Sequence, residues 1–150
     1  MKKGTFFIAI AIAGITILCS YNSFKKTGNS TEGILFFKGT WTDALKKAKK
    51  ENKMIFLDAY ANWCGPCKKM KSNTFSDKSV ADFYNKYFIN VAKDMENGEG
   101  KSLAKIFEVQ AYPTLIFLNS NGFIIEKTLG FKDPGAFLKI GKNVLSRSEK

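Results

Sequence analysis

The chain has 150 residues, of which 45% are hydrophobic and 14 are phenylalanine, and it carries a formal net charge of +11. This composition excludes a disordered chain and leaves room for one domain with a buried core. The positive charge comes without a zinc-finger, helix-turn-helix or RNA-recognition motif, so it argues against nucleic acid as a specific partner and for solvated basic helix faces.

The first 20 residues are typical of an export segment. Lys2 and Lys3 precede residues 6–18, an unbroken run of apolar or small residues. A helix that spans a bilayer needs about 20 apolar residues, so this run is short for an anchor and suits a signal peptide. We therefore predict an exported protein in the bacterial periplasm, with a short uncleaved anchor as the alternative.

Cys19 adds a third possibility for this segment. It directly follows the apolar run, where bacterial lipoproteins carry the cysteine that is acylated, although Leu18 stands where a small residue is usual. Lipidation of Cys19 would tether the protein to the membrane, facing the periplasm. The polar residues 21–33 are predicted to form a tether between this segment and the domain.

The first half of the domain is predicted to alternate strands and helices. Residues 34–38 favour a strand, and Thr40 or Thr42 can cap a helix that runs to about Asn52. Residues 54–60 are almost continuously apolar, as in a strand covered on both faces. A further helix is expected from residues 64–67 to about Asn73.

The second half continues this alternation and ends in a hairpin and a helix. Ser76 and Asp77 can cap a helix, residues 88–93 favour a strand, 97–100 a loop and 101–107 a short helix. Strands are predicted at 114–118 and 123–127, joined by the turn-forming residues 119–122. Asp133 and Pro134 open the last helix. The order predicts an α/β sandwich with a mixed sheet, formed by residues 34–146.

Two cysteines carry the candidate chemistry. Cys64 and Cys67 are three residues apart at an expected helix start, which brings both sulfurs to one side of the first turn. Pro66 suits that turn because its missing N–H is not needed there. Free backbone N–H groups at the helix start favour the thiolate form of Cys64, the species that attacks disulfides. The pair is therefore predicted to be redox-active.

The other uses of a Cys-x-x-Cys pair fit less well. Zinc needs four ligands, whereas the chain has three cysteines, one of them in the export segment, and no histidine. The missing histidine also excludes catalysis by a Cys–His pair. A static disulfide would close a loop of only two residues and would constrain the unfolded chain little. No metal or cofactor is expected.

Three segments resemble the thioredoxin superfamily: residues 55–68 around the cysteine pair, residues 112–114 (Tyr-Pro-Thr), and Gly130 after the last strand. The resemblance covers about residues 36–143 and implies a thioredoxin-like three-layer sandwich with a central mixed β-sheet. Residues 70–77 lack the helix-kinking proline of cytosolic thioredoxins. They are similar to the C-terminal domain of the transmembrane thiol:disulfide interchange protein and related exported proteins.

The resemblance also implies residue roles. Cys64 would be the nucleophile, Cys67 the resolving thiol and Asp58 the buried carboxylate that exchanges protons with Cys67; surrounding apolar residues should raise its pKa. A strand-end Asp58 paired with a lysine is the plain alternative, and Lys93 is the candidate for the family's lysine near that carboxylate. Six residues would bind the substrate: Trp63, Gly65, Pro66, Tyr112, Pro113 (if its peptide bond is cis) and Gly130.

These roles predict a thiol–disulfide oxidoreductase that reduces, or relays electrons to, disulfides of exported proteins. Its partners would be disulfide-containing exported proteins and a membrane protein that resupplies electrons, with possible membrane association through the N-terminus. Two alternatives stay open. One is a disulfide oxidase or isomerase, and the other is a peptide-binding module whose cysteine pair is regulatory.

Overall fold

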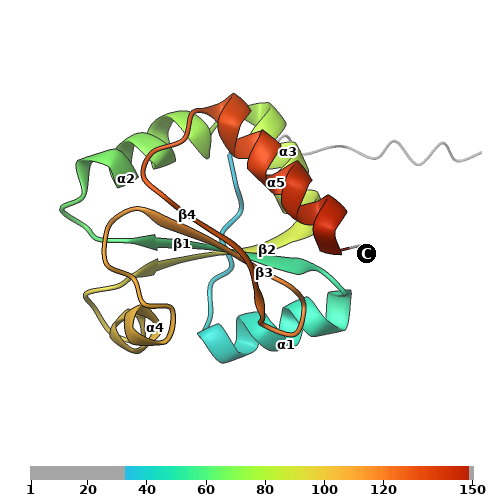
Figure 1. Cartoon of the computed structure of the whole chain (residues 1–150), viewed down its shortest axis with the longest axis horizontal. Helices are drawn as coiled ribbons and strands as arrows, with labels where there is room; N and C mark the ends of the chain where they lie inside the picture. The colour runs from blue at the N-terminus through green and yellow to red at the C-terminus, as the bar shows by residue number, and fades with distance from the viewer. Residues whose placement is uncertain (1–32, 149–150) are drawn as a thin grey trace, which may run out of the picture.

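A computed structural model describes residues 33–148, and in it a four-stranded mixed sheet lies between two layers of helices (Figure 1). The strand order is β2-β1-β3-β4. The predicted export segment, Cys19 and all but the last residue of the predicted tether lie outside the described residues. The three-layer α/β sandwich is confirmed. Its elements are α1 (Trp41–Glu51), β1 (Met54–Tyr60), α2 (Gly65–Lys69), η1 (Met70–Thr74), α3 (Lys78–Tyr87), β2 (Phe88–Asp94), α4 (Gly100–Ile106), β3 (Thr114–Leu118), β4 (Ile124–Leu129) and α5 (Pro134–Ser148).

The central strand β1 organises the sheet. It pairs in parallel with β2 and antiparallel with β3, while β4 pairs antiparallel with β3 at one edge. Its first six residues are all buried, as the apolar run predicted. Side chains alternate between the two faces of a strand, so Phe56 and Asp58 point to one face and Leu57 and Ala59 to the other.

Each face of the sheet carries its own hydrophobic core. On one face α2, α3 and α5 cover a cluster rich in aromatic rings, with Phe56, Tyr84 and Phe137 at its centre. On the other face α1 and α4 pack Ala44, Ala48 and Leu103 against aliphatic residues of the strands. Because helices pack on both faces, the ends of these helices are held in fixed positions relative to the sheet.

The predicted strand at residues 34–38 is wrong. Only an isolated bridge between Phe36 and Asn90 joins this segment to the edge strand β2. The amide of Leu35 donates to the Asn85 side chain at 2.8 Å, and that side chain donates back to the Gly33 carbonyl at 3.2 Å. The segment is therefore held by the Asn85 side chain and by single backbone bonds, of Ile34 to Phe75 and of Phe37 to Asn90, in place of a continuous strand ladder.

The helix that starts at the cysteine pair does not continue regularly to Asn73. After α2 the chain forms a π-helical turn, η1, in which the Phe75 amide donates to the Met70 carbonyl at 2.9 Å. The Thr74 hydroxyl donates to the Lys132 carbonyl and the Lys132 amide contacts the Met70 sulfur. The segment that lacks the family's proline therefore contains a wider, π-helical turn.

Most other expected boundaries lie within a residue or two of the observed ones. Thr40 caps α1 and Asp77 caps α3, each by accepting a backbone N–H of the first turn. The hairpin strand β4 runs later than the predicted residues 123–127, and α5 extends two residues beyond 146. Within residues 33–148, none of the helices has the length and apolar character required to span a bilayer.

Candidate active site

Cys64 and Cys67 form a disulfide where β1 leads into α2. Their sulfurs are 2.05 Å apart, and Cys64 is the N-cap of the helix. The Cys67 amide donates to the Cys64 sulfur at 3.1 Å. When the pair is reduced, the same donor and the helix dipole are placed to stabilise a Cys64 thiolate. Gly65 and Pro66 follow in the first turn and are exposed, as expected for the surface beside the pair.

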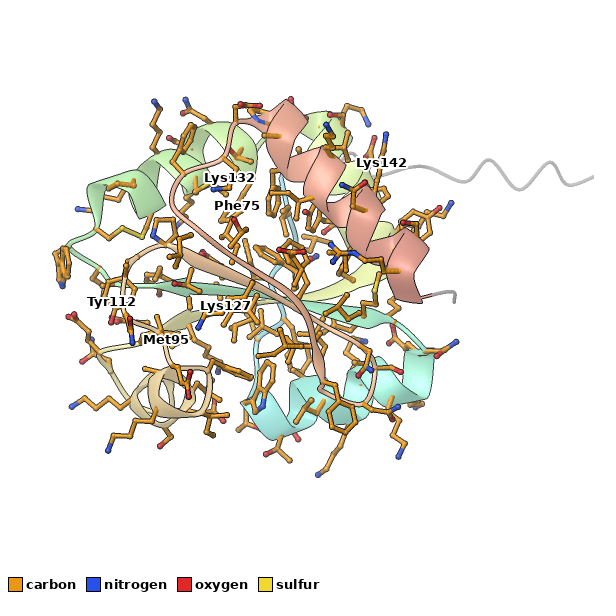
Figure 2. The ribbon with its side chains drawn as sticks, viewed as in Figure 1. Phe75, Met95, Tyr112, Lys127, Lys132 and Lys142 are labelled. Carbon is orange, nitrogen blue, oxygen red and sulfur yellow. A yellow bond between two sulfur atoms is a disulfide. The ribbon has the colours of Figure 1, made fainter. Side chains whose placement is uncertain are left out.

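Tyr112, Pro113 and Gly130 come together beside the sheet. The Tyr112–Pro113 peptide bond is cis, as the resemblance implied, and the Gly130 amide donates to the Pro113 carbonyl at 2.8 Å. Tyr112 lies at the sheet end near the start of α2 (Figure 2) and packs, with Ala61, against the two cysteines. Gly130 has φ +80°, and no heavy atom lies within 4 Å of where its Cβ would stand. Pro113 itself is buried, and the open space lies at Gly130.

Asp58 is buried on β1, on the face that α2 covers. Only 6% of the residue is exposed, and its Oδ1 atom has no hydrogen-bond partner in the described part of the chain. Burial without a compensating partner disfavours the charged form and raises the pKa of Asp58 to about 7. A carboxyl group with this pKa can both accept and release a proton near neutral pH.

A cavity of about 410 Å³ joins Asp58 to the cysteine pair. Asp58 and Cys67 both line it, whereas Cys64 does not. The other lining residues are Phe36, Tyr60, Ala61, Asn62, Lys68, Lys71, Phe75 and Ala92. A proton can therefore pass between the Asp58 carboxyl group and the Cys67 sulfur through the cavity, because its polar lining can hold water.

Trp63 lies beside the cysteine pair, and its side chain is exposed. It is 67% exposed, its indole N–H donates to Glu96 Oε2 at 2.9 Å, and its ring meets Tyr112 edge to face at 5.8 Å. Its neighbour Asn62 donates to the Asp94 carboxylate. Hydrogen bonds therefore join the two residues before Cys64 to the end of β2 and to the segment that follows it.

Lys93 is not the partner of Asp58. Its ammonium group pairs with Glu99 at 2.8 Å and donates to the Gly39 carbonyl at 2.9 Å. The β1–β2 register places Ala92 opposite Asp58 and Lys93 opposite Ala59. Because adjacent residues of a strand face opposite sides, Lys93 points to the other face of the sheet. The suggestion that Lys93 is the lysine near the buried carboxylate is therefore wrong. No lysine in the described part of the chain pairs with Asp58 either, so the alternative of a lysine-paired Asp58 is not found there.

Four residues near the site had no role in the sequence-based prediction: Lys68, Lys71, Asp94 and Glu96. Asp94 and Glu96 could have been found by one signal. They stand at and just after the end of β2, which runs parallel to β1, and the carboxyl ends of parallel strands meet at one edge of the sheet. Lys68 and Lys71 lie one helical turn apart after the cysteine pair, a spacing that puts them on one side of the helix.

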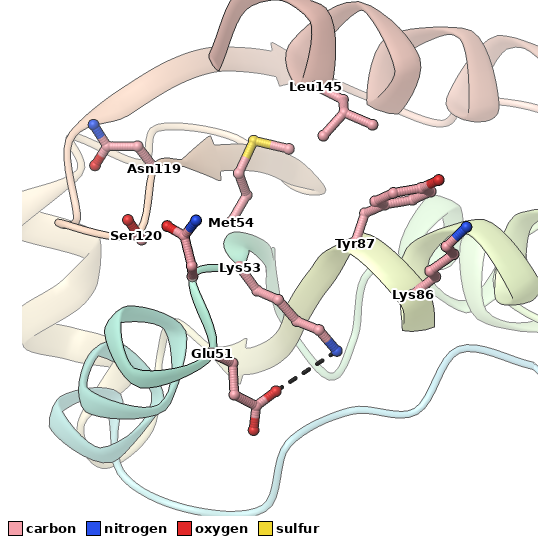
Figure 3. A pocket seen from close by; sticks show the side chains of 9 residues that line it. Glu51, Lys53, Met54, Lys86, Tyr87, Asn119, Ser120 and Leu145 are labelled. Carbon is pink, nitrogen blue, oxygen red and sulfur yellow. Dashed lines mark ion pairs between the residues drawn. The ribbon is translucent and has the colours of Figure 1, made fainter. Parts of the chain in front are cut away.

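A second cavity, of about 420 Å³, lies at the other end of β1. Figure 3 shows Met54, the first residue of the strand, together with Tyr87 of α3 and Leu145 of α5 around it. Lys53 in this cavity pairs with Glu51 at 3.6 Å. Since the cysteines follow the opposite end of β1, this cavity is not part of their chemistry. Within residues 33–148 no three metal-ligating side chains of the His, Cys, Asp or Glu types gather closely enough to hold an ion.

Among known protein families, the thioredoxin-like domain matches this chain. The match runs over residues 41–145, which include all the elements from α1 to β4 and most of α5.

Several curated proteins are similar in sequence. Thioredoxin H4 of Arabidopsis thaliana is 36% identical over 103 residues, covering 69% of this chain and 82% of that protein. The thiol:disulfide interchange protein DsbD of Haemophilus influenzae is 29% identical over 144 residues, covering 87% of this chain. The chain spans only 25% of that DsbD.

Solved structures give the same picture. A candidate disulphide-isomerase from Bacteroides thetaiotaomicron is 42% identical, covers 76% of this chain and 95% of its own, and superposes with a TM-score of 0.67. A thioredoxin from Thermus thermophilus reaches the same TM-score at 21% identity, which supports the fold alone.

Proposed function

The chain belongs to the thioredoxin-like family and is a thiol–disulfide oxidoreductase, and we propose that it reduces disulfides of exported proteins through Cys64 and Cys67. One observation carries the proposal: Cys67 and the unpartnered, buried Asp58 line a common cavity next to the cysteine pair. A disulfide with only a structural role needs no proton acceptor of this kind.

Cys64 is the nucleophile in this mechanism. In the reduced protein its thiolate attacks one sulfur of a substrate disulfide, a mixed disulfide forms, and the other substrate sulfur leaves as a thiolate. The Cys67 amide, 3.1 Å from the Cys64 sulfur in the oxidised pair, favours the attacking thiolate.

Cys67 then resolves the mixed disulfide. Its thiol gives a proton to Asp58 through the shared cavity, and the resulting thiolate attacks the Cys64 sulfur. The Cys64–Cys67 bond forms, the second substrate thiolate leaves, and two electrons have passed to the substrate. Since the pKa of Asp58 is about 7, the carboxyl group can accept this proton near neutral pH and later release it.

The substrate is an extended peptide held beside the cysteines. Pro113, with its cis peptide bond, and Gly130 are joined by a backbone hydrogen bond, and there is open space where a side chain of residue 130 would stand. Trp63 and Tyr112 form an aromatic surface next to the pair. Gly65 and Pro66 have small side chains, so the first turn of α2 leaves room for a substrate chain to approach the cysteines. These residues form the substrate surface in our proposal.

We place this activity outside the cytoplasm, in the periplasm or on a membrane tether facing it. The predicted export segment 1–20, with its possible lipidation at Cys19, and the similarity to part of DsbD support this location. A reductant in an oxidising compartment needs resupply, so we propose a membrane electron donor as its partner.

Isomerisation of disulfides is the second candidate function. It is favoured by the likeness to the candidate disulphide-isomerase of Bacteroides thetaiotaomicron at 42% identity. An isomerase gets its electrons back from the same substrate and ends reduced, whereas a reductase ends oxidised. The two therefore differ in the number of electrons consumed for each substrate molecule.

Insulin-disulfide reduction with dithiothreitol tests the proposal. The wild type should accelerate precipitation of the insulin B chain, a Cys64→Ser variant should be inactive, and a Cys67→Ser variant should accumulate the mixed disulfide. Equal rates for wild type and Cys64→Ser would refute the catalytic role. A potential above about −180 mV in a glutathione equilibrium would refute the reducing direction. Refolding of scrambled ribonuclease in place of net reduction would favour the isomerase.

A further inference from the structure

Two neighbouring apolar side chains are exposed where the β3–β4 turn enters β4. Phe123 ends the turn, where its carbonyl accepts from the Asn119 amide at 2.9 Å, and it is 71% exposed. Ile124, the first residue of β4, is 49% exposed. Nowhere else among residues 33–148 are two consecutive residues both large, apolar and exposed. Apolar side chains that lie together in water favour contact with another apolar medium.

This turn lies along a basic stretch of α1. A Cβ at Gly122 would stand 3.0 Å from Leu45 Cδ2, so the turn packs against the middle of α1. Asn52, which follows α1, lines the second cavity together with two residues of the turn. Lys49 comes one helical turn after Leu45, on the same side of α1, and Lys46 is its neighbour on the helix surface. Positive charge therefore borders the apolar turn.

The charge on this side of α1 is only partly balanced. Lys46, Lys49 and Lys50 are exposed, and none of them forms an ion pair within the part of the chain that the structure describes. Of the two carboxylates of α1, Asp43 accepts from the hydroxyl of the N-cap residue and Glu51 pairs with two other lysines. Three cations beside an exposed aromatic ring match a surface that combines negative charge with an apolar interior.

We propose that the hairpin patch, formed by Phe123, Ile124, Lys46, Lys49 and Lys50, rests on an anionic lipid bilayer. The two apolar side chains enter the headgroup region and the lysines lie over lipid phosphates. This inference goes beyond the redox role, because it concerns how the domain is placed against the membrane.

The predicted N-terminal tether makes a weak contact sufficient. Residues 21–33 extend to about 45 Å at most. If residues 1–20 hold the chain at a membrane, as proposed above, the domain stays within that distance of the lipid surface. The effective concentration of lipid around the patch is then high, and a few lysines with one aromatic ring suffice.

Contact through this patch leaves the cysteine pair accessible. β4 runs from Ile124 to Leu129, and Gly130 beyond it bonds to Pro113 in the proposed substrate surface. At about 3.3 Å for each residue, the strand separates Phe123 from Gly130 by roughly 20 Å. The patch and the substrate surface therefore lie at opposite ends of β4.

A second copy of the chain fits the patch less well than lipid does. Two copies joined here would bring the three lysines of each close together, and like charges repel. The edge strand β4 also carries Lys127, and lysines on edge strands oppose pairing with another strand.

Hydrogen exchange of the full chain tests the contact. The protein is mixed with vesicles of phosphatidylglycerol or of phosphatidylcholine, and exchange is read by mass spectrometry. We expect exchange of residues 119–124 to slow about fivefold or more on the anionic vesicles, to stay unchanged on the neutral ones, and to recover in concentrated salt. Equal exchange on both kinds of vesicle would overturn the proposal. Slowing that appears without lipid as the protein concentration rises would assign the patch to a second copy and overturn it as well.

Charge variants separate the patch from the overall positive charge. Lys46→Glu/Lys49→Glu should raise the phosphatidylglycerol concentration needed for half of the slowing by roughly 25-fold, because each lysine at an anionic surface contributes about fivefold. Lys139→Glu/Lys142→Glu changes the net charge equally on the exposed side of α5, with the same spacing, and should have a much smaller effect. Equal effects of the two variants would show that only the net charge matters and would overturn the proposal.

An apolar pair of variants tests the insertion. Phe123→Ser should raise the same lipid concentration roughly tenfold, since it removes one large apolar side chain from the contact. Leu35→Ser alters a side chain that is also exposed but lies outside the patch, and it should have no effect. If Phe123→Ser binds like the wild type, the turn does not enter the lipid.

Insulin reduction is measured for every variant in parallel. We expect wild-type rates throughout, because the patch is remote from the cysteines, and these rates also show that each variant is folded. Intact insulin reduction without lipid-dependent slowing would remove this inference and leave the oxidoreductase function standing.

Discussion

Burial of the Asp58 carboxyl group links the redox chemistry to the stability of the fold. The group stands among apolar side chains of β1 and the helices that cover it, and its Oδ1 atom has no partner within the described residues. Its pKa is about 7 in the folded protein, against an ordinary value of 3.8. A buried carboxyl group of this kind costs stability whenever it must ionise.

The sign of the pH dependence follows from these two values. Between about pH 4 and pH 7 the folded protein keeps a proton that the unfolded chain has lost. Stability therefore falls as the pH rises through this window and levels off above the folded-state pKa. Asparagine cannot ionise, so Asp58→Asn should lose this dependence. The free energy of unfolding of the oxidised variant, relative to wild type, should rise by roughly 3 kcal/mol between pH 4 and pH 8.

Urea unfolding of the oxidised proteins at pH 4, 6 and 8 measures this difference. Asp82→Asn is the matched control, because Asp82 is exposed and pairs only with Lys78 on the surface of α3. Its effect should stay within about 0.5 kcal/mol. A difference for Asp58→Asn that does not change with pH would contradict the raised pKa.

The same residue should set the pH dependence of catalysis. Loss of the proton acceptor in Asp58→Asn should slow the resolving step at pH 7 by at least about tenfold. Mixed disulfide with the substrate should then accumulate, although less fully than we expect in Cys67→Ser. Acid-quenched samples analysed by mass spectrometry measure this species. A variant that turns over at the wild-type rate would show that solvent alone accepts the proton.

At the scale of elements, two asparagines help to hold residues 33–38 against the edge of the sheet. Asn85 of α3 accepts from the Leu35 amide and donates to the Gly33 carbonyl, so it replaces two bonds that a strand ladder would provide. Asn90 of β2 adds the Phe36 bridge and lies close to the Asn85 side chain. Together with the backbone bonds of Ile34 and Phe37, these side chains attach the segment at several points.

Asn85→Ala should therefore loosen this segment. It leaves two backbone groups without partners and should lower the free energy of unfolding by about 1–3 kcal/mol. Amide hydrogen exchange should show the loss first at Leu35. Asn143→Ala, at an exposed position of α5, is the control and should change stability by no more than about 0.5 kcal/mol. Unchanged protection at Leu35 would mean that the Asn85 bonds contribute little.

At the scale of the whole molecule, α3 and α5 are joined through an aromatic stack. The rings of Tyr84 and Phe137 lie 4.2 Å apart and nearly parallel, and the Tyr84 hydroxyl donates to the Phe137 carbonyl at 2.9 Å. Gly141 permits this approach, since a Cβ there would stand 2.8 Å from the Tyr84 oxygen. The helix layer that carries the active-site helix is packed around this contact.

Gly141→Ala should therefore destabilise the protein although alanine favours helices. The clash costs about 1–3 kcal/mol, and the gain in helix propensity returns at most about 1 kcal/mol. We expect a net loss of about 1–2 kcal/mol in urea unfolding. Gly135→Ala lies on the exposed first turn of the same helix and should be neutral or slightly stabilising. Equal effects of the two substitutions would contradict the packing argument.

Much of the fold followed from the sequence because its signals are local. The apolar run of β1 and the caps at Thr40 and Asp77 act between residues that are neighbours in the chain. The same holds for the spacing of Cys64 and Cys67 at a helix start, which indicates a redox-active pair because the chain has no histidine and too few other ligands for zinc. The roles of Asp58 and Pro113 were inferred from the resemblance, because both residues lie within its matching segments.

Only the tertiary structure decided the features that depend on distant pairings. Residues 34–38 look like a strand, but side chains 50 residues away determine how their backbone is bonded. The face on which Lys93 lies depends on strand register, in which one residue reverses the direction of the side chain. The cavity joining Asp58, Cys67, Lys68 and Lys71 exists only once β1 and α2 are packed together, because no local pattern records the space left between two elements.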